Sequence, residues 1–137
     1  MTVRDIMSHR VEAAAPDETV LDARDRLRDG RFRHLPVVEG GRLVGVVSDR
    51  DVLRAAGPSL GATEFDDDVG PGTDRALREV MTRDVVTADP TMSVEEAADL
   101  LLRHDVSALP VLDEGRLVGI VTTADVLRLA AGQEREP

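Results

Sequence analysis

Apolar residues recur at helical spacing in two stretches of the chain. In the first, Val20, Ala23 and Leu27 share one face of a helix that begins at the capping pair Thr19 and Asp22. The second begins with a stronger capping box, in which Glu96 stands three residues after Ser93. Its predicted buried stripe consists of Val94, Ala97, Ala98, Leu101 and Leu102. The pattern therefore predicts two amphipathic helices, each with one buried face.

Each of these helices is followed by two short apolar runs rich in β-branched residues. Residues 35–38 and 43–47 flank a turn at Gly40-Gly41, and residues 106–111 and 115–121 form the second pair of runs. Such runs around a glycine turn predict a β-hairpin. Helix starts are predicted at Ser48 and Thr122, a helical turn at residues 2–7 and a brief strand from Val11 to Pro16.

The elements recur because the sequence is a tandem duplication. Residues 4–56 align without a gap with residues 78–130, at an offset of 74 positions that carries Asp51 onto Asp125. A unit of about 50 residues is marginal alone, so the two copies are expected to pack together with pseudo-twofold symmetry. We expect repeats at 1–57 and 78–132, an acidic, Gly/Pro-rich linker at 58–77 and a frayed tail at 133–137.

Composition narrows the possible partners. The formal net charge is −10, which disfavours nucleic acid and anionic membrane surfaces as partners. The absence of Cys excludes disulfides and Cys-based zinc sites, and the apolar runs are too short to span a bilayer. We therefore expect a cytoplasmic protein.

Catalytic motifs are not recognisable in the sequence. His9, His34 and His104 lack metal-ligand spacing, and neither a P-loop nor a dinucleotide-binding glycine motif occurs. The acidic run at residues 66–68 is better explained as a solvated loop than as a metal site. We therefore predict that the chain is not an enzyme and requires no metal.

Two strand-to-helix junctions carry the best candidate chemistry. Ser48-x-x-Asp51 and Thr122-x-x-Asp125 each place a hydroxyl at a helix start and a carboxylate three residues later. This spacing is a capping box, and spacing alone favours that interpretation. The alternative is that the carboxylate accepts hydrogen bonds from a ribose diol while the hydroxyl and the helix N-terminus hold phosphate oxygens.

Positive charge lies near only one of the two junctions. Arg33 and His34 precede the first Leu-Pro-Val segment, and Arg50 lies inside the first junction. The corresponding residues of the second repeat are Ser107, Ala108 and Ala124. The basic residues of the first repeat are candidates for phosphate contact, with a solvated surface role as the alternative.

The order of these motifs resembles a cystathionine β-synthase (CBS) motif. The resemblance lies in residues 11–16, Leu35-Pro36-Val37-Val38, residues 41–45 and Ser48-x-x-Asp51, and it repeats in the second half. The whole chain is thus similar to a CBS-domain pair, or Bateman module. This resemblance implies an α+β fold of two β-α-β-β-α motifs packed sheet to sheet, with adenosine ligands bound in clefts between the motifs.

The resemblance also implies roles for individual residues. Asp51 and Asp125 would hold ribose, with Ser48 and Thr122 beside them, and Arg33, His34 and Arg50 would meet phosphates. The base would lie against Val11, Ala13, Phe32 and Val46 in one half and Val85, Thr87, Val106, Ser107, Ala108 and Ile120 in the other. Ser8 and Thr82 match a further position near the ligand. A cleft in this family usually combines the Asp of one motif with base-contacting residues of the other.

The main hypothesis is a regulatory module that senses AMP, ADP or ATP, forms a homodimer and acts in trans on an effector protein. Two alternatives remain: a ligand-free interaction scaffold, and a binder of S-adenosylmethionine or NAD.

Overall fold

The computed structural model describes residues 1–30, 33–56 and 72–133, which form two compact units. The hairpin-1 unit comprises Glu12–Asp84, and the hairpin-2 unit comprises Met1–Val11 together with Val85–Pro137. Most of the predicted linker, including Asp66, Asp67 and Asp68, lies outside the described residues. Phe32 and the tail after Gln133 also lie outside them.

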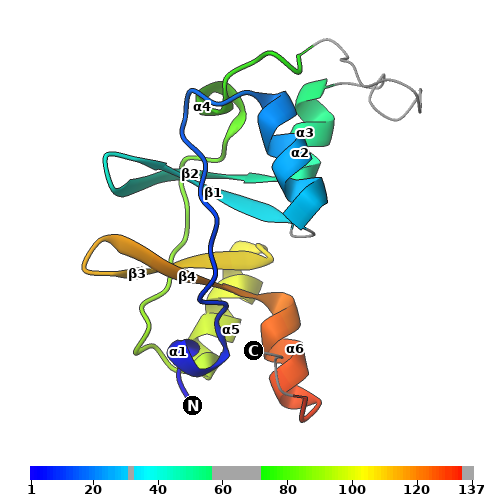
Figure 1. The fold of residues 1–137 in the computed structure, drawn as a ribbon. Coiled ribbons are helices and arrows are strands. Elements are labelled where there is room, and N and C mark those ends of the chain that lie inside the picture. Colours follow the sequence, from blue (N-terminus) through cyan, green and yellow to red (C-terminus); the bar gives the residue numbers. More distant parts are fainter. Residues whose placement is uncertain (31–32, 57–71, 134–137) are drawn as a thin grey trace. The chain divides into compact units, whose positions relative to one another are not determined.

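The described residues of the hairpin-1 unit form the first predicted hairpin and three helices. Its elements are α2 (Val20–Gly30), β1 (His34–Glu39), β2 (Arg42–Ser48), α3 (Asp49–Ala56) and α4 (Leu77–Val80) (Figure 1). The strands pair antiparallel, with Leu35 opposite Val47. Gly40 and Gly41 form the turn with φ of 60° and 83°, a left-handed conformation that glycine adopts without strain.

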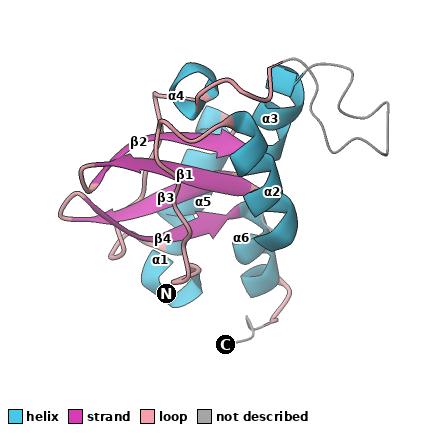
Figure 2. Ribbon diagram, turned by 45° about the horizontal axis from the view of Figure 1, so that its top comes forward, coloured by secondary structure: helices cyan, strands magenta, loops and turns pink. Residues whose placement is uncertain are grey.

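The hairpin-2 unit repeats this arrangement. It consists of α1 (Val3–Ile6), α5 (Val94–His104), β3 (Ala108–Asp113), β4 (Arg116–Thr122) and α6 (Thr123–Ala130) (Figure 2). Leu109 pairs with Val121 in the same register as its counterpart in the other hairpin. Two antiparallel hairpins combined with helices confirm the α+β fold class.

The strand predicted from Val11 to Pro16 is shorter than expected. It is reduced to one parallel bridge, in which Ala14 donates to the Pro36 carbonyl and accepts from the Val38 amide, both at 2.8 Å. Pro16 lacks an amide hydrogen, so pairing cannot extend through it. Ala88 makes the equivalent bridge in the hairpin-2 unit, where Pro90 follows.

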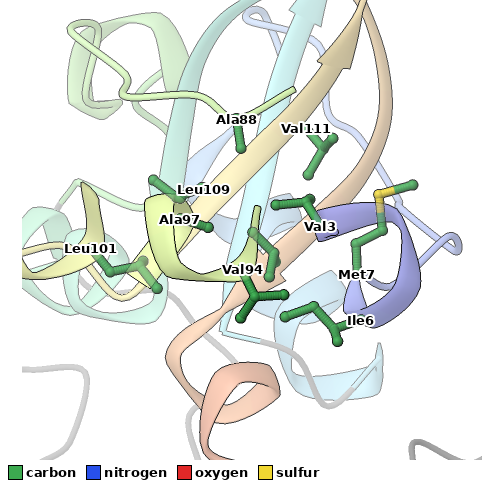
Figure 3. Packing of buried hydrophobic residues seen from close by; sticks show 10 residues of the cluster. Val3, Ile6, Met7, Ala88, Val94, Ala97, Leu101, Leu109 and Val111 are labelled. Atoms are coloured by element: carbon green, nitrogen blue, oxygen red, sulfur yellow. The ribbon is translucent and has the colours of Figure 1, made fainter. Parts of the chain in front are cut away.

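The short helices α1 and α4 each pack with the hairpin of the other repeat. Val3, Ile6 and Met7 belong to the same buried cluster as Leu109 and the inner residues of α5 (Figure 3). In the hairpin-1 unit, Leu77 and Met81 from the second repeat join the cluster around Leu35. The repeats therefore exchange their N-terminal segments, so the compact units do not coincide with the repeats.

The exchanged segments approach the hairpins at a glycine. A Cβ atom at Gly119 would stand 2.6 Å from Met7 Sδ and 2.8 Å from the Ser8 carbonyl oxygen. One residue further on, Ser8 and Ile120 form a backbone bridge. Gly45 is equally close to Met81 and Thr82 in the other unit. Both glycines are therefore required for the backbone of the exchanged segment to reach the sheet.

One predicted core residue is wrong. Leu102 was expected in the buried stripe of α5, but it is 82% exposed, whereas Val94, Ala97 and Leu101 are buried. Val94, Ala97 and Leu101 follow one another at intervals of three and four residues on the inner face, whereas Leu102 lies about 100° beyond Leu101, outside that face. The capping boxes at Thr19 and Ser93 are confirmed by their hydrogen bonds.

Candidate functional site

The start of α3 is organised by Ser48 and Asp51. The Ser48 amide donates to Asp51 Oδ2 at 2.9 Å, and the Asp51 amide donates to Ser48 Oγ at 3.1 Å. These reciprocal bonds are those of a capping box, so the capping interpretation is confirmed here. The first of these bonds occupies Oδ2 of the carboxylate, and Oδ1 lies 3.5 Å from Arg54 Nη1. Ribose binding at Oδ1 is thus compatible with capping.

The start of α6 has the same capping geometry with a tighter ion pair. Asp125 Oδ2 accepts from the Thr122 amide at 2.8 Å and from Thr122 Oγ1 at 3.1 Å. Its Oδ1 accepts from Arg128 Nη1 at 3.1 Å. Asp125 is only 3% exposed, and a carboxylate this buried requires such partners to stay charged. Arg54 and Arg128 were not among the predicted site residues, although both occur three positions after the aspartate.

Arg33 and His34 lie beside the start of α3. The Asp49 amide donates to the Arg33 carbonyl at 3.0 Å, which places the end of the loop before β1 at the helix N-terminus. Burial lowers the pKa of His34, and the nearby charge of Arg33 lowers it further, while Asp49 and Asp51 oppose the shift. The lowered pKa favours the neutral form of His34, and Arg33 and Arg50, both exposed, are the other predicted basic residues at this helix start.

A further arginine anchors one of the predicted base-contacting segments. Arg26 donates to Glu18 Oε1 at 2.9 Å, to Glu12 Oε1 at 3.1 Å and to the Ala13 carbonyl at 2.8 Å. Burial alone would lower the pKa of Arg26, but the hydrogen bonds to both glutamates outweigh it and raise the pKa. Arg26 thus positions Ala13. Sequence spacing does not reveal this role of Arg26, because its partners are 8 to 14 residues away.

The structure distributes the predicted site residues over both units. The hairpin-1 unit holds Ala13, Arg33, His34, Val46, Ser48, Arg50, Asp51 and Thr82. The hairpin-2 unit holds Ser8, Val11, Val85, Thr87, Val106, Ser107, Ala108, Ile120, Thr122 and Asp125. Val11 and Ala13, predicted to face one base, thus belong to different units. Their roles in ligand binding stay predictions.

Segment exchange brings residues from both repeats to each helix start. Ser8 pairs with Ile120 through amide–carbonyl bonds of 2.8 and 3.1 Å, two residues before Thr122 on β4. Thr82 pairs with Val46 through two bonds of 3.0 Å, two residues before Ser48 on β2. The strand that leads into each helix is therefore bridged to a hydroxyl-bearing residue of the other repeat.

A cavity of about 430 Å³ lies between α1 and α6 of the hairpin-2 unit. Its lining comprises Met1, Asp5, Ile6, Asp125, Arg128, Leu129, Gly132 and Gln133. Asp125 and Arg128 therefore border this cavity. The other lining residues are not among those predicted to contact base or phosphate.

Within residues 1–30, 33–56 and 72–133, no group of three or more His, Asp or Glu side chains is arranged to hold a metal ion. Over the same residues, none of the helices is both long and apolar enough to cross a bilayer.

Two stretches of the chain match the same protein family. The sequence pattern of the CBS domain matches twice, at residues 3–57 and at residues 77–132. The chain belongs to the CBS-domain family. Among curated proteins, this CBS-domain chain is 36% identical over 132 residues to the uncharacterized protein MJ1225 of Methanocaldococcus jannaschii. That match covers 94% of the chain, which spans about half (47%) of the length of MJ1225.

Solved structures show the same fold for CBS-domain pairs. The CBS domain pair of protein MJ0100, in complex with 5-methylthioadenosine and S-adenosyl-L-methionine, matches with a TM-score of 0.81 and 30% identity. The match covers 96% of the present chain and 97% of that one. CBSX2 in complex with AMP matches with a TM-score of 0.78 and 32% identity, over 96% of each chain.

Proposed function

We propose that this CBS-domain chain is a regulatory module that binds an adenine nucleotide, AMP, ADP or ATP, and acts in trans on an effector protein. The observation that carries the proposal is the AMP complex of CBSX2, a neighbour with 32% identity along nearly the whole chain. The Ser48-x-x-Asp51 helix start supports it, because the capped carboxylate of Asp51 retains Oδ1, which can accept hydrogen bonds from ribose hydroxyls. In this proposal the module is cytoplasmic and does no catalysis itself.

Regulation requires the ligand to favour one of two states of the module. A ligand shifts such an equilibrium only through a difference in its affinity for the two states. The adenine nucleotide would therefore change the surface that the effector protein meets.

A second candidate ligand is S-adenosylmethionine. The specific observation in its favour is the MJ0100 domain pair, which was solved with S-adenosyl-L-methionine and 5-methylthioadenosine. S-adenosylmethionine shares the ribose diol with AMP but carries a sulfonium group and no phosphate. The basic residues Arg33 and Arg50 favour a phosphate-bearing ligand over a cationic one.

A thermal-shift panel tests the proposal and separates the alternatives. The whole chain is melted with AMP, ADP, ATP, S-adenosylmethionine or NAD. A ligand at 100 times its dissociation constant stabilises the folded state by about 2.7 kcal/mol. We expect at least one adenine nucleotide to raise the melting temperature. A shift with S-adenosylmethionine or NAD alone would replace the proposed ligand, and no shift with any compound would favour the ligand-free scaffold.

We also propose that the chain forms a homodimer. Leu53 on α3 and Leu127 on α6 occupy matching repeat positions and are 55% and 62% exposed. A large apolar side chain is thus exposed at the same position of both repeats, and we take these two positions as contacts with the second chain. Light scattering should then give twice the chain mass of 14.8 kDa.

Substitution of both leucines by Glu tests this surface. We expect the Leu53→Glu, Leu127→Glu protein to be monomeric, because burial of two carboxylates at an apolar contact is costly. Leu102→Glu is the matched control, since Leu102 is 82% exposed and lies on α5 instead. A wild-type mass of one chain, or a doubly substituted protein that stays dimeric, would contradict the proposal.

A further inference from the structure

The two candidate aspartates share a sequence pattern but differ in accessibility. The side chain of Asp51 is 13% exposed, whereas that of Asp125 is 1% exposed. Both carboxylates cap their helices through Oδ2, which leaves Oδ1 as the second oxygen of each. That oxygen is the acceptor still available to a ligand once the cap is formed.

The arginine three positions later holds Oδ1 differently in the two units. Arg128 Nη1 donates to Asp125 Oδ1 at 3.1 Å, and the Arg128 side chain is 38% exposed. Arg54 Nη1 lies 3.5 Å from Asp51 Oδ1, and the Arg54 side chain is 72% exposed. An ion pair that is exposed and this long contributes little, so a ligand can displace it at low cost. Displacing Arg128 would leave a buried carboxylate without its cation, which is costly.

A ribose diol requires an accessible carboxylate. Its two hydroxyl groups donate hydrogen bonds, and both must reach acceptor lone pairs that are not already occupied. Asp51 meets this requirement once Arg54 moves aside into solvent. At Asp125, Arg128 occupies Oδ1 and Thr122 occupies Oδ2.

The basic residues that could bind phosphate also belong to the α3 start. The backbone around the two helix starts is equivalent, since the Asp49 amide donates to the Arg33 carbonyl and the Thr123 amide to the Ser107 carbonyl, both at 3.0 Å. The side chains differ, because Arg33 corresponds to Ser107 and Arg50 to Ala124. Only the α3 start therefore combines an accessible carboxylate with guanidinium groups that can pair with phosphate oxygens.

We infer that Asp51, and not Asp125, holds a phosphate-bearing adenosine ligand, so that each chain binds one nucleotide. At the start of α6, the ion pair of Arg128 with Asp125 prevents a ligand from using that carboxylate. This inference rests on the proposed function and assigns the two aspartates different roles. Asp51 contacts the ligand, whereas the Asp125–Arg128 pair stabilises α6. The cavity beside Asp125 offers the competing location, because Asp125 and Arg128 form part of its lining.

Isothermal titration of the full chain with AMP, ADP and ATP tests the inference. We expect one nucleotide per chain. Asp51→Asn keeps the oxygen that accepts the Ser48 amide but removes the charge, and should weaken binding about tenfold or more, as loss of charge-assisted hydrogen bonds does. Asp125→Asn should bind one nucleotide with affinity within about threefold of wild type, because hydrogen bonds that the ligand does not make are not lost.

The arginine variants give a readout that does not depend on the aspartate variants folding. Arg128→Ala releases Asp125 Oδ1 and should add a second, weaker binding event, whereas the matched Arg54→Ala should leave the number of sites at one. Two sites in the wild type, loss of binding only in Asp125→Asn, or a single site in Arg128→Ala would each overturn the inference. Absence of binding by every nucleotide would instead overturn the proposed function.

Discussion

Val3→Asp should unfold the hairpin-2 unit, although Val3 belongs to the first repeat. Val3 is fully buried, in the same cluster as Leu109, Val111 and Val121 of the second repeat. A carboxylate placed there has no cationic partner within the cluster, and an uncompensated buried charge costs about 3–5 kcal/mol. Hydrogen exchange followed by mass spectrometry should therefore show loss of protection in β3, β4 and α5.

Leu77→Asp is the reciprocal control. Leu77 occupies the repeat position of Val3, is also fully buried, and contributes to the cluster around Leu35. Its substitution should remove protection from β1, β2 and α2 by the same mechanism. If Val3→Asp instead exposes β1 and β2, the segment exchange between the repeats is not present in solution.

Gly119→Ala should destabilise the hairpin-2 unit by about 1–3 kcal/mol, as overpacking of a filled interior does. The new Cβ would stand 2.8 Å from the Ser8 carbonyl oxygen, a backbone atom, so the exchanged segment itself must move. Denaturant unfolding measures this loss. Nucleotide affinity, followed by isothermal titration, should change little, because Ser8 adjoins the α6 start and not Asp51. Gly45→Ala should destabilise the hairpin-1 unit in the same way, and there affinity should also fall, because Thr82 pairs with Val46 next to the α3 start.

Gly115→Asn provides the matched control for this substitution. Gly115 lies in the hairpin turn with φ of 82°, and no atom stands within 4 Å of its added Cβ. Asn tolerates this left-handed conformation, so the change in unfolding free energy should stay within about 0.5 kcal/mol. A Gly119→Ala protein as stable as this control would show that the close approach of residues 7–8 to β4 is not maintained.

The local elements of the fold follow directly from the sequence. Apolar runs around Gly40-Gly41 and Gly115 predict the two hairpins, and Ser/Thr-x-x-Asp/Glu patterns predict the helix starts. The structure contains these hairpins and these helix starts. These predictions succeed because turns and caps depend on residues at most a few positions apart. The prediction that Leu102 is buried is wrong, because Leu102 lies about 100° around α5 from Leu101, outside the face that holds Val94, Ala97 and Leu101.

The sequence by itself determined the duplication, the hairpins, the caps and the family of this protein. Only the tertiary structure decided which hairpin accepts Val3 and Met7, because burial of apolar surface is non-directional and both repeats offer similar apolar partners. It also decided that the Asp125 side chain is 1% exposed and held by Arg128 at 3.1 Å, whereas that of Asp51 is 13% exposed and lies 3.5 Å from Arg54. Both aspartates are followed by an arginine at the same spacing, so the difference arises from the packing around each helix and not from the motif.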